Sequence, residues 1–491
     1  MKKIYFCVFI LLQSCDGKNY NNWSTNFNHI GSFSSPRAID LNADGVLDIV
    51  VGTGAMEWQP NDTSVIALDG KNGNMLWHVS GRNQMVGSAI FMDINNDGTK
   101  DVFIGGRSAE LKAIDGKSGK VIWEFFKTRD PFLPKKYGWF NFTNPQFVPD
   151  QNKDGFNDIL VSNGGDATLL PDNKNRPCGK LLIISGLTGK IIAQAIVPDG
   201  NETYMSVVVY KEQDTYKIIF GSGGETIGGH FYKTTLAHLL NNDICMAEVL
   251  AETKDKGFVG PPVLADINKD GIYDIVCNVA NGKLIAINGA NNKKLWEVSI
   301  PFAEAYTSPG IGNFTDDDVP DFFCNYAIGV WPSFLNAVQI LVNGKTGKII
   351  KKYQIGNFSY SSPLCLDYNK DGHDDILLNI NYKAFTKNYE QNPFQKLIVF
   401  DFYNNKMDRI GDSIQGINWA STPLITDIDN DGSVDILYSC SFAEEKDNPE
   451  TFSHKNQTSI TFKKNAIKGL GKKYVKWGGY MGYNGDGVYL K

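Results

Sequence analysis

The sequence predicts an all-β protein that folds as an eight-bladed β-propeller, with the ring closed by the N-terminal strand. Three observations lead to this prediction. A nine-residue loop rich in aspartate recurs at spacings of 47 to 60 residues, apart from one gap of double length. Several copies are followed by a second hairpin with an Asp-Gly or Asn-Gly turn between apolar flanks. Four short strands per repeat at this period are typical of a propeller.

The first copy of the loop runs from Asp40 to Asp48 and has the composition of a site for a hard cation. Acidic or amide side chains occupy positions one, three, five and nine. Glycine at position six allows a sharp turn, and position seven offers only its backbone carbonyl. Calcium binds about six to eight oxygen ligands, and alternating Asp and Asn deliver them from one side of a tight turn. We call this nine-residue pattern the aspartate loop.

Six copies of the aspartate loop are intact, which predicts about six calcium ions. The predicted ligands at positions one, three, five, seven and nine are, in chain order, Asp40, Asn42, Asp44, Val46, Asp48, Asp93, Asn95, Asp97, Thr99, Asp101, Asp150, Asn152, Asp154, Phe156, Asp158, Asp266, Asn268, Asp270, Ile272, Asp274, Asp367, Asn369, Asp371, His373, Asp375, Asp427, Asp429, Asp431, Ser433 and Asp435. A degenerate copy, with Asp318 in place of the glycine, gives a candidate seventh site at Asn313, Thr315, Asp317 and Asp321. The alternative is a set of hairpins held by side chain–backbone hydrogen bonds without metal.

The double gap between Asp150 and Asp266 predicts a hidden repeat near residue 208. The segments 206–210 and 216–221 keep the strand–turn–strand pattern there. Their connecting loop is shorter and retains only Glu212 and Asp214. We therefore expect eight repeats, of which the fourth has lost its aspartate loop.

The N-terminus has the pattern of a targeting segment. Lys2 and Lys3 precede an apolar run over residues 4–12 that is too short to span a bilayer. Leu12-Gln13-Ser14-Cys15 resembles a bacterial lipobox. The resemblance implies a signal peptide over residues 1–14, a lipidated Cys15 and a tether over 15–22. The protein would then be anchored to a bacterial membrane outside the cytoplasm, on the periplasmic side or at the cell surface. An ordinary cleaved signal peptide is the alternative.

The N-terminal strand is expected to complete the last repeat. Trp23 precedes Ser35-Pro36 by the spacing that separates Trp296 from Ser308-Pro309, so Trp23 belongs to an outermost strand that lacks earlier partners. Residues 23–491 then form a single propeller. Residues 487–490 resemble a third strand, which would leave 441–486 as one long insertion in blade eight. The alternative is a third strand over residues 458–463.

Charge and cysteine content narrow the function only slightly. The formal net charge of −6 gives no support for a nucleic-acid partner. Four cysteines lie in strand-like apolar stretches and are predicted to be buried thiols, namely Cys277, Cys324, Cys365 and Cys440. Whether Cys178 and Cys245 pair stays open.

The repeats resemble two known kinds of propeller. The aspartate loops look like the FG-GAP repeats of integrin α-subunit propellers and their bacterial relatives. The hairpins over 67–77, 113–123 and 286–296, with weaker copies over 184–193 and 342–350, look like the tryptophan-docking repeats of quinoprotein propellers. Together these repeats cover nearly the whole mature chain. The resemblance implies that calcium hairpins lie on one face and that a ligand binds on the opposite face.

Several residues are candidates for that ligand face. Six repeats carry an aromatic residue seven or eight positions ahead of the first ligand of their loop. These residues would encircle the channel mouth, as inter-blade packing or as a stacking surface for a sugar. They are Phe33, Phe142, Phe258, Tyr306, Tyr360 and Trp419. Blade four carries the glycine-rich segment 221–230, which contains Glu225 and His230. Together with Arg107 these two are the weak catalytic candidates, and no catalytic residue is assigned.

The leading functional hypothesis is a calcium-stabilised lipoprotein that acts as a binding or scaffolding module for a glycan or a protein. A polysaccharide lyase is the first rival, because such enzymes also use eight-bladed propellers with calcium loops. A quinoprotein dehydrogenase is the second rival. It is disfavoured, because the chain has neither an adjacent cysteine pair nor a Cys-x-x-Cys-His motif.

Overall fold

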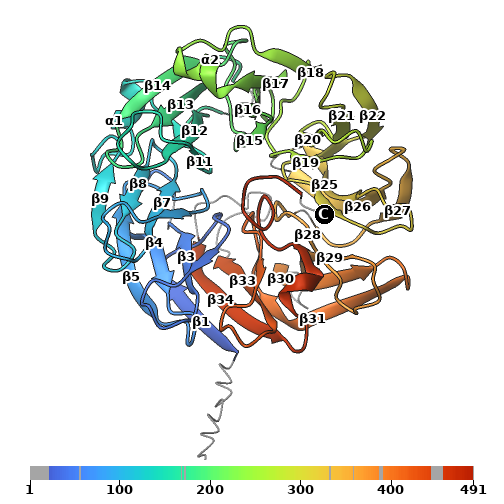
Figure 1. Cartoon of the computed structure of the whole chain (residues 1–491). Helices are drawn as coiled ribbons and strands as arrows, with labels where there is room; N and C mark the ends of the chain where they lie inside the picture. Colours follow the sequence, from blue (N-terminus) through green and yellow to red (C-terminus); the bar gives the residue numbers. More distant parts are fainter. Residues whose placement is uncertain are drawn as a thin grey trace, which may run out of the picture.

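Eight small antiparallel sheets form a ring around a central axis, which confirms the predicted eight-bladed propeller (Figure 1). The computed structural model describes residues 22–489 apart from 55–56, 167, 171–172, 331–332, 358, 386–390 and 444–456. The predicted signal peptide, Cys15 and nearly all of the predicted tether therefore lie outside the described residues. None of the helices in the described part is long and apolar enough to cross a membrane.

Each blade contributes its first strand to the channel and its last strand to the rim. Blades one and two comprise β2 (Arg37–Ile39), β3 (Asp48–Gly52), β4 (Asn61–Leu68), β5 (Met75–Gly81), β6 (Ile90–Met92), β7 (Asp101–Gly105), β8 (Leu111–Ile114) and β9 (Val121–Glu124). Blades three and four comprise β10 (Asn141–Phe142), β11 (Gln146–Val148), β12 (Asp158–Gly164), β13 (Lys180–Ile184), β14 (Ile191–Ile196), β15 (Val208–Glu212), β16 (Thr215–Gly221), β17 (Gly229–Thr235) and β18 (Glu248–Thr253). Blade four, the hidden repeat, is thus confirmed.

The second half of the ring has longer strands. Blades five and six comprise β19 (Val263–Ala265), β20 (Asp274–Val279), β21 (Lys283–Ile287), β22 (Lys294–Ser299), β23 (Ala303–Glu304), β24 (Gly310–Gly312), β25 (Asp321–Val330), β26 (Ser333–Val342) and β27 (Ile349–Tyr353). Blades seven and eight comprise β28 (Leu364–Leu366), β29 (Asp375–Phe385), β30 (Gln391–Asp401), β31 (Lys406–Gln415), β32 (Leu424–Thr426), β33 (Val434–Ala443), β34 (Gln457–Ile467) and β1 (Trp23–Asn28), and β35 (Val475–Trp477) adds to blade seven. Three short helical segments complete the chain: α1 (Leu133–Lys136), α2 (Leu236–Leu240) and the 3-10 helix η1 (Lys472–Tyr474).

Strand position explains the sequence pattern within each blade. The second strand lies in the interior of its blade and is buried along its whole length, as in β3 and β7, so it reads as an apolar run. The fourth strand faces solvent on one side, and β5 and β22 alternate buried and accessible residues accordingly. The four cysteines predicted to be buried are buried. Cys178 and Cys245 are exposed, and all six cysteines of the described chain are free thiols.

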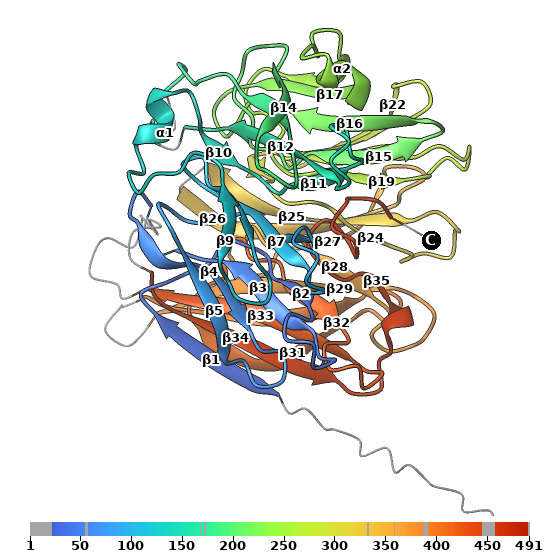
Figure 2. The ribbon, with the colours of Figure 1, turned by 60° about the vertical axis from the view of Figure 1, so that its left-hand side comes forward.

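The N-terminal strand closes the ring as predicted. β1 pairs antiparallel with β34, from Trp23 opposite Lys464 to Asn28 opposite Ser459, and both views show the two strands side by side (Figures 1 and 2). The third strand of blade eight is therefore β34, which corresponds to the alternative assignment. The expectation that residues 487–490 supply this strand, with 441–486 as one insertion, is wrong. Residues 487–490 match only a short local pattern. β34 is a long strand that pairs with β33 on one side and with β1 on the other.

The C-terminal tail, residues 468–489, instead lies at the centre of the ring (Figure 1). β35 pairs with β28, the amide of Ile425 donates to the carbonyl of Gly478, and the guanidinium of Arg37 donates to the carbonyl of Tyr480. Further along, the tail accepts from Gln146 and from the amide of Leu264. The tail thus contacts the innermost strands of blades seven, eight, one, three and five.

Tryptophans on the fourth strands connect neighbouring blades. The indole N–H of Trp23 donates to the carbonyl of Gly70 in blade one, at 2.9 Å. The equivalent bonds join Trp77 to Gly116, Trp123 to Gly186 and Trp296 to Gly344, at 2.7–2.9 Å. Three residues beyond each acceptor is a glycine with φ of 70–74°, where an added Cβ would lie within 2.8 Å of the tryptophan; these are Gly73, Gly119, Gly189 and Gly347. The tryptophan-docking hairpins therefore form contacts between blades, and one of these contacts lies at the ring closure.

Replacing Trp23 by alanine is expected to lower the melting temperature by a few degrees. The substitution removes a half-buried indole and its hydrogen bond across the closure, which together are worth roughly 2–3 kcal/mol. Trp77→Ala removes the equivalent contact between blades one and two, where the indole is more buried, and should cost at least as much. Ser24→Ala, at an exposed position of the same strand, is the control. An unchanged calorimetric melt for Trp23→Ala would show that this contact does not stabilise the ring.

Candidate functional site

A cavity of about 450 Å³ lies at the centre of one face of the ring. Its walls come from segments that precede first strands, such as Phe33 and Tyr306, and from loops that follow second strands, such as Glu57, Arg107 and Glu225. Both kinds of segment lie at the ends of the strands that are remote from the aspartate loops. The cavity, which we call the central cup, therefore opens on the face predicted for a ligand.

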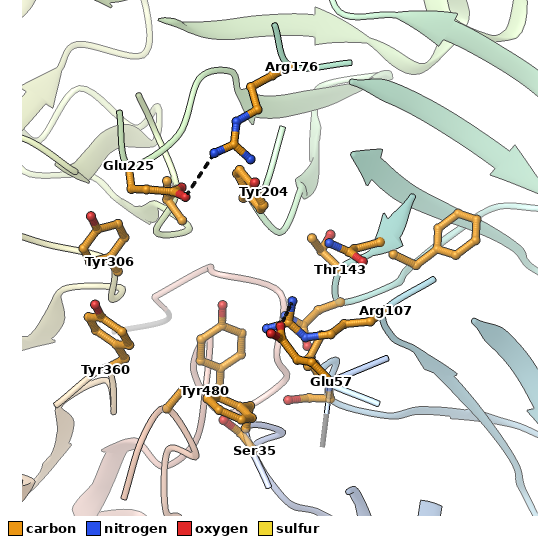
Figure 3. Close-up of a pocket in the computed structure, with 18 of the residues that line it drawn as sticks. Ser35, Glu57, Arg107, Thr143, Arg176, Tyr204, Glu225, Tyr306, Tyr360 and Tyr480 are labelled. Atoms are coloured by element: carbon orange, nitrogen blue, oxygen red, sulfur yellow. Dashed lines mark hydrogen bonds and ion pairs between the residues drawn. The ribbon is translucent and has the colours of Figure 1, made fainter. Parts of the chain in front are cut away.

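Aromatic side chains form part of the cup wall. Tyr306 and Tyr360 lie with ring centroids 5.0 Å apart, and the hydroxyl of Tyr306 donates to Glu304 at 2.6 Å. Figure 3 shows both on one side of the cup, with Tyr480 of the C-terminal tail beside them. Tyr204 also lines the cup, so four tyrosines of the described chain contribute to it.

The predicted aromatic ring is divided between the cup and the packing between blades. Phe33 and Phe142, like the two tyrosines from the ring, line the cup. Phe258 is fully buried and stacks on Phe231 at 5.2 Å, and Trp419 packs on Phe33 at 6.3 Å. The set is therefore divided between the cup lining and packing inside the protein, and the sugar-stacking surface stays a prediction.

Small polar residues two or three positions after the aromatic ones join adjacent blades. The amide of Ser362 donates to the hydroxyl of Thr422, and the amide of Thr422 donates to the hydroxyl of Ser35. Asn144 makes the corresponding link by donating to the hydroxyl of Ser206. These bonds therefore link adjacent blades close to Tyr360 and Tyr204.

Arg176 organises the charged part of the wall and was not predicted from the sequence. Its side chain is almost fully buried, and it donates to the carbonyls of Asp166, Leu170 and Asn173 at 2.9–3.0 Å. The same guanidinium lies 3.8 Å from the carboxylate of Glu225 and 3.9 Å from that of Glu202. Arg176 is thus fixed by its own loop and positions Glu225 at the cup.

Glu202 lies behind this wall with its side chain fully buried. Burial raises the pKa of Glu202 to about 7, and the attraction of Arg176 opposes that rise. A Cβ at Gly224 would lie 2.6 Å from a Glu202 oxygen, so the glycine allows the blade-four loop to approach the carboxyl group.

Arg107 forms a second ion pair in the cup, with its guanidinium 2.7 Å from the carboxylate of Glu57. Both side chains are about one-sixth exposed. Figure 3 shows this pair across the cup from Arg176 and Glu225. The cup therefore has a guanidinium–carboxylate pair on each of two sides and tyrosine rings between them.

Two of the three weak catalytic candidates meet in the cup and the third does not. Arg107 and Glu225 both line it. His230 lies in β17, with Nδ1 2.8 Å from Asp199 and Nε2 3.7 Å from Glu252, and it is not part of the lining. The structure thus provides no pairing of His230 with the other two candidates.

The aspartate loops share one backbone conformation. Their position-six glycines all have φ between 81° and 94°, in the left-handed region that the predicted sharp turn requires. In the first loop, the amides of Asp44 and Gly45 donate to Asp40, and the amide of Asp44 also donates to Asn42. In the degenerate copy Asp318 takes the place of the glycine at φ 34°.

The aspartate at position nine has a role that the sequence did not indicate. Asp48 is fully buried and accepts from the amide of Leu41 in its own loop, at 2.9 Å, and from the amide of Gly70, at 3.1 Å. Asp101 and Asp274 make the same two kinds of bond. In these three blades position nine therefore connects the aspartate loop to the tryptophan-docking hairpin of the same blade.

Comparison with known proteins gives a family and a fold. A family described as the FAM234A/B β-propeller matches residues 23–365. The human protein FAM234B is 24% identical over 395 residues, which cover 72% of this chain and 57% of the human protein. The chain thus spans little more than half the length of that relative.

Solved structures of low identity share the fold. A europium-containing methanol dehydrogenase superposes with a TM-score of 0.53 at 10% identity, over 90% of this chain and 92% of the enzyme. The quinohaemoprotein alcohol dehydrogenase of Comamonas testosteroni gives 0.52 at 13% identity, over 92% and 77%. At these identities the likeness concerns the fold alone, and the FG-GAP assignment stays a prediction. Because the family match spans well over half of the sequence, the chain belongs to the FAM234A/B β-propeller family.

Proposed function

We propose that this protein is a binding module that takes a carbohydrate in the central cup. The observation that supports the proposal most is the combination of tyrosine rings with two guanidinium–carboxylate pairs around a cavity of about 450 Å³. A sugar ring presents C–H groups that pack on aromatic faces and hydroxyls that bond to carboxylates and guanidinium groups. Pockets of this volume are within the usual range for small ligands.

The charge balance of the cup favours a neutral polyhydroxy ligand. Arg107 is paired with Glu57, and Arg176 is surrounded by Glu225, Glu202 and three backbone carbonyls. A strongly anionic ligand would have to displace one of these carboxylates. Hydroxyl groups can instead donate to the carboxylates and accept from the guanidinium groups without breaking either pair.

Binding without turnover is a better fit to the cup than lyase chemistry. A lyase needs a base and an unpaired cationic group beside the acidic sugar. The candidate base His230 is engaged with Asp199 outside the cup, and the candidate cation Arg107 is paired with Glu57. Release of unsaturated, ultraviolet-absorbing products from pectic or algal polysaccharides would support the lyase instead.

We further propose that calcium stabilises the propeller at its aspartate loops. The shared left-handed turn and the carboxylate and amide side chains at positions one, three and five support this. Position nine would contribute a buried carboxylate that is already oriented by two amides. The cation would neutralise the negative charge of each loop, and the loops of blades one, two, three, five and seven fit this role. Blade eight differs and is treated separately below.

The N-terminal sequence supports an extracytoplasmic location with a lipid anchor at Cys15. The charged start, the short apolar run and the lipobox-like tetrapeptide carry this part of the proposal. The tether would end at β1, which lies at the rim of blade eight (Figure 2).

Loss of cup residues should weaken sugar binding in solution. A glycan array would first identify a ligand, and calorimetric titration would then compare variants. Tyr306→Ala should weaken binding about thirty-fold, because a central aromatic contact contributes roughly 2 kcal/mol, and Glu225→Gln should weaken it by a similar order. Tyr137→Ala changes an exposed tyrosine outside the cup and is the control. No glycan binding by the folded wild type, or equal losses for Tyr137→Ala, would contradict the proposal.

Calcium removal should destabilise the chain. With calcium at about one hundred times its dissociation constant, each site adds roughly 2.7 kcal/mol, so chelation should lower the melting temperature by many degrees. Asp150→Asn together with Asp154→Asn should reduce this calcium-dependent shift. Asp412→Asn, at an exposed position in β31, should leave it unchanged. If chelation does not move the melt of the wild type, the calcium proposal fails.

Lipid attachment should depend on one residue. In cells given a radiolabelled fatty acid, the wild type should incorporate label and fractionate with membranes. Cys15→Ser should lose the label, because its sulfur is the acceptor, and should be recovered in the soluble fraction. Cys178→Ser serves as the control. Label retained by Cys15→Ser would exclude this anchor.

A further inference from the structure

Blade eight contains a buried lysine inside its aspartate loop. The side chain of Lys464, in β34, is 0% exposed, and its ammonium nitrogen lies 2.8 Å from Asp429 and 3.2 Å from Asp435. These carboxylates occupy positions three and nine of the loop. Together with Asp427 at position one they form the one group of described residues whose ligand atoms all lie within 4.8 Å of one another. The lysine ammonium thus lies at the place where this loop would hold a metal ion.

The strand register shows that this lysine is peculiar to blade eight among the blades with a loop. Lys464 pairs with Leu437, the residue two positions after the ninth of the loop. In the other six loop-bearing blades the residue at this register is apolar and buried, namely Ala67, Ala113, Ile183, Ala286, Leu341 and Val399. A lysine at this position is therefore a replacement of a core residue and not a solvated surface charge.

A second departure in the same loop compensates for the lysine. Position three is asparagine in the five other intact loops, whereas blade eight has Asp429. Burying a lysine costs several kcal/mol unless carboxylates pair with it, and the additional carboxylate supplies that pairing. The positive charge added by Lys464 and the negative charge added by Asp429 therefore cancel.

Blade four gives an independent parallel. Alignment of Gly221 in β16 with Gly52 in β3 places Lys233 at the register of Lys464, and Lys233 pairs with Ile219. Lys233 is likewise buried, and its ammonium donates to the carbonyl of Gly289. Blade four has no aspartate loop. Within the described chain, a lysine therefore occurs at this register in blades four and eight. Neither of these blades has an aspartate loop with asparagine at position three.

Lys71 in blade one shows the contrast with an ordinary surface contact. Its ammonium lies 2.6 Å from Asp44, but the side chain is about one-quarter exposed and comes from the neighbouring hairpin turn. It can rotate into solvent when a cation arrives. Lys464 is enclosed between β33 and β1 and has no such route.

We propose that the ammonium of Lys464 serves as a built-in cation for the blade-eight loop, and that this loop takes no calcium. A divalent ion bonded to Asp429 and Asp435 would lie within a few Å of a fixed positive charge, in a site of low dielectric where repulsion is strong. This inference rests on the proposed calcium sites of the other loops only because the number of ions that they bind is the reference for counting the ions of the variants. It makes blade eight, where the two chain ends meet, independent of the calcium supply.

Counting bound calcium tests the inference. Wild type, Lys464→Met and Lys463→Met would be freed of metal with chelator, and bound calcium per folded chain would be measured by equilibrium dialysis with atomic absorption. Lys464→Met should bind one ion more than the wild type, because it frees the carboxylates of Asp429 and Asp435. Lys463, on the opposite face of β34, is the matched control and should leave the number unchanged. An equal number for Lys464→Met and wild type overturns the inference.

Two further measurements keep the test decisive. Lys464→Met combined with Asp429→Asn recreates the asparagine and apolar pattern of the other blades, and it should fold and gain the extra ion even if the single variant does not fold. Chelator should lower the melting temperature of either variant by more than that of the wild type. If the wild type binds no calcium and the variants bind one ion, the proposal for the other loops fails and this inference stands. If neither variant binds more than the wild type, this inference fails whatever the other loops bind.

Discussion

The ring of this propeller is closed by strands from the two ends of the described chain that pair in one blade, and the packing of blade eight on blade one depends on that closure. Blade eight is assembled from β32, β33 and β34 of the C-terminal region and from β1 of the N-terminal region. The register of β1 on β34 brings Trp23 onto the glycine hairpin of blade one. The contact that joins blade one to two, two to three and five to six is thereby repeated at the seam.

That geometry produces the cup. Since inner strands converge on the axis, the residues that precede them and the loops that follow second strands gather at one end of the channel. Hydrogen bonds between small polar residues, such as Thr422 and Ser35, link adjacent blades there. Long loops then add groups that differ from blade to blade, including Arg176 and Glu57, and Tyr480 from the tail contributes to the lining. A symmetric scaffold thus presents an asymmetric set of contacts.

Much of the fold and less of the cup could be predicted from the sequence. The period of the aspartate loops gave the blade count, and the distance from Trp23 to Ser35 gave the closure, because both are properties of a repeated pattern. The third strand of blade eight was misassigned, because a tetrapeptide cannot reveal which distant strand it will pair with. Arg176, Glu202 and Tyr480 lie in segments without a period and were missed. Tyr204 precedes Ser206 by the spacing that separates Tyr360 from Ser362, so attention to that spacing in blade four would have found it.

The position of the C-terminal tail has a consequence for how the molecule unfolds. Repeat arrays whose terminal units contact a single neighbour can lose those units one at a time. Here the N-terminal strand is paired within the last blade, and the tail contacts inner strands of five blades, including β28 and β19. Both ends of the described propeller are therefore held by contacts with other strands, and the tail can make its contacts only after those blades are in place. The propeller should therefore lose its structure in one cooperative transition. The tail should be the last segment to dock during folding and should lose its contacts first when the ring is incomplete.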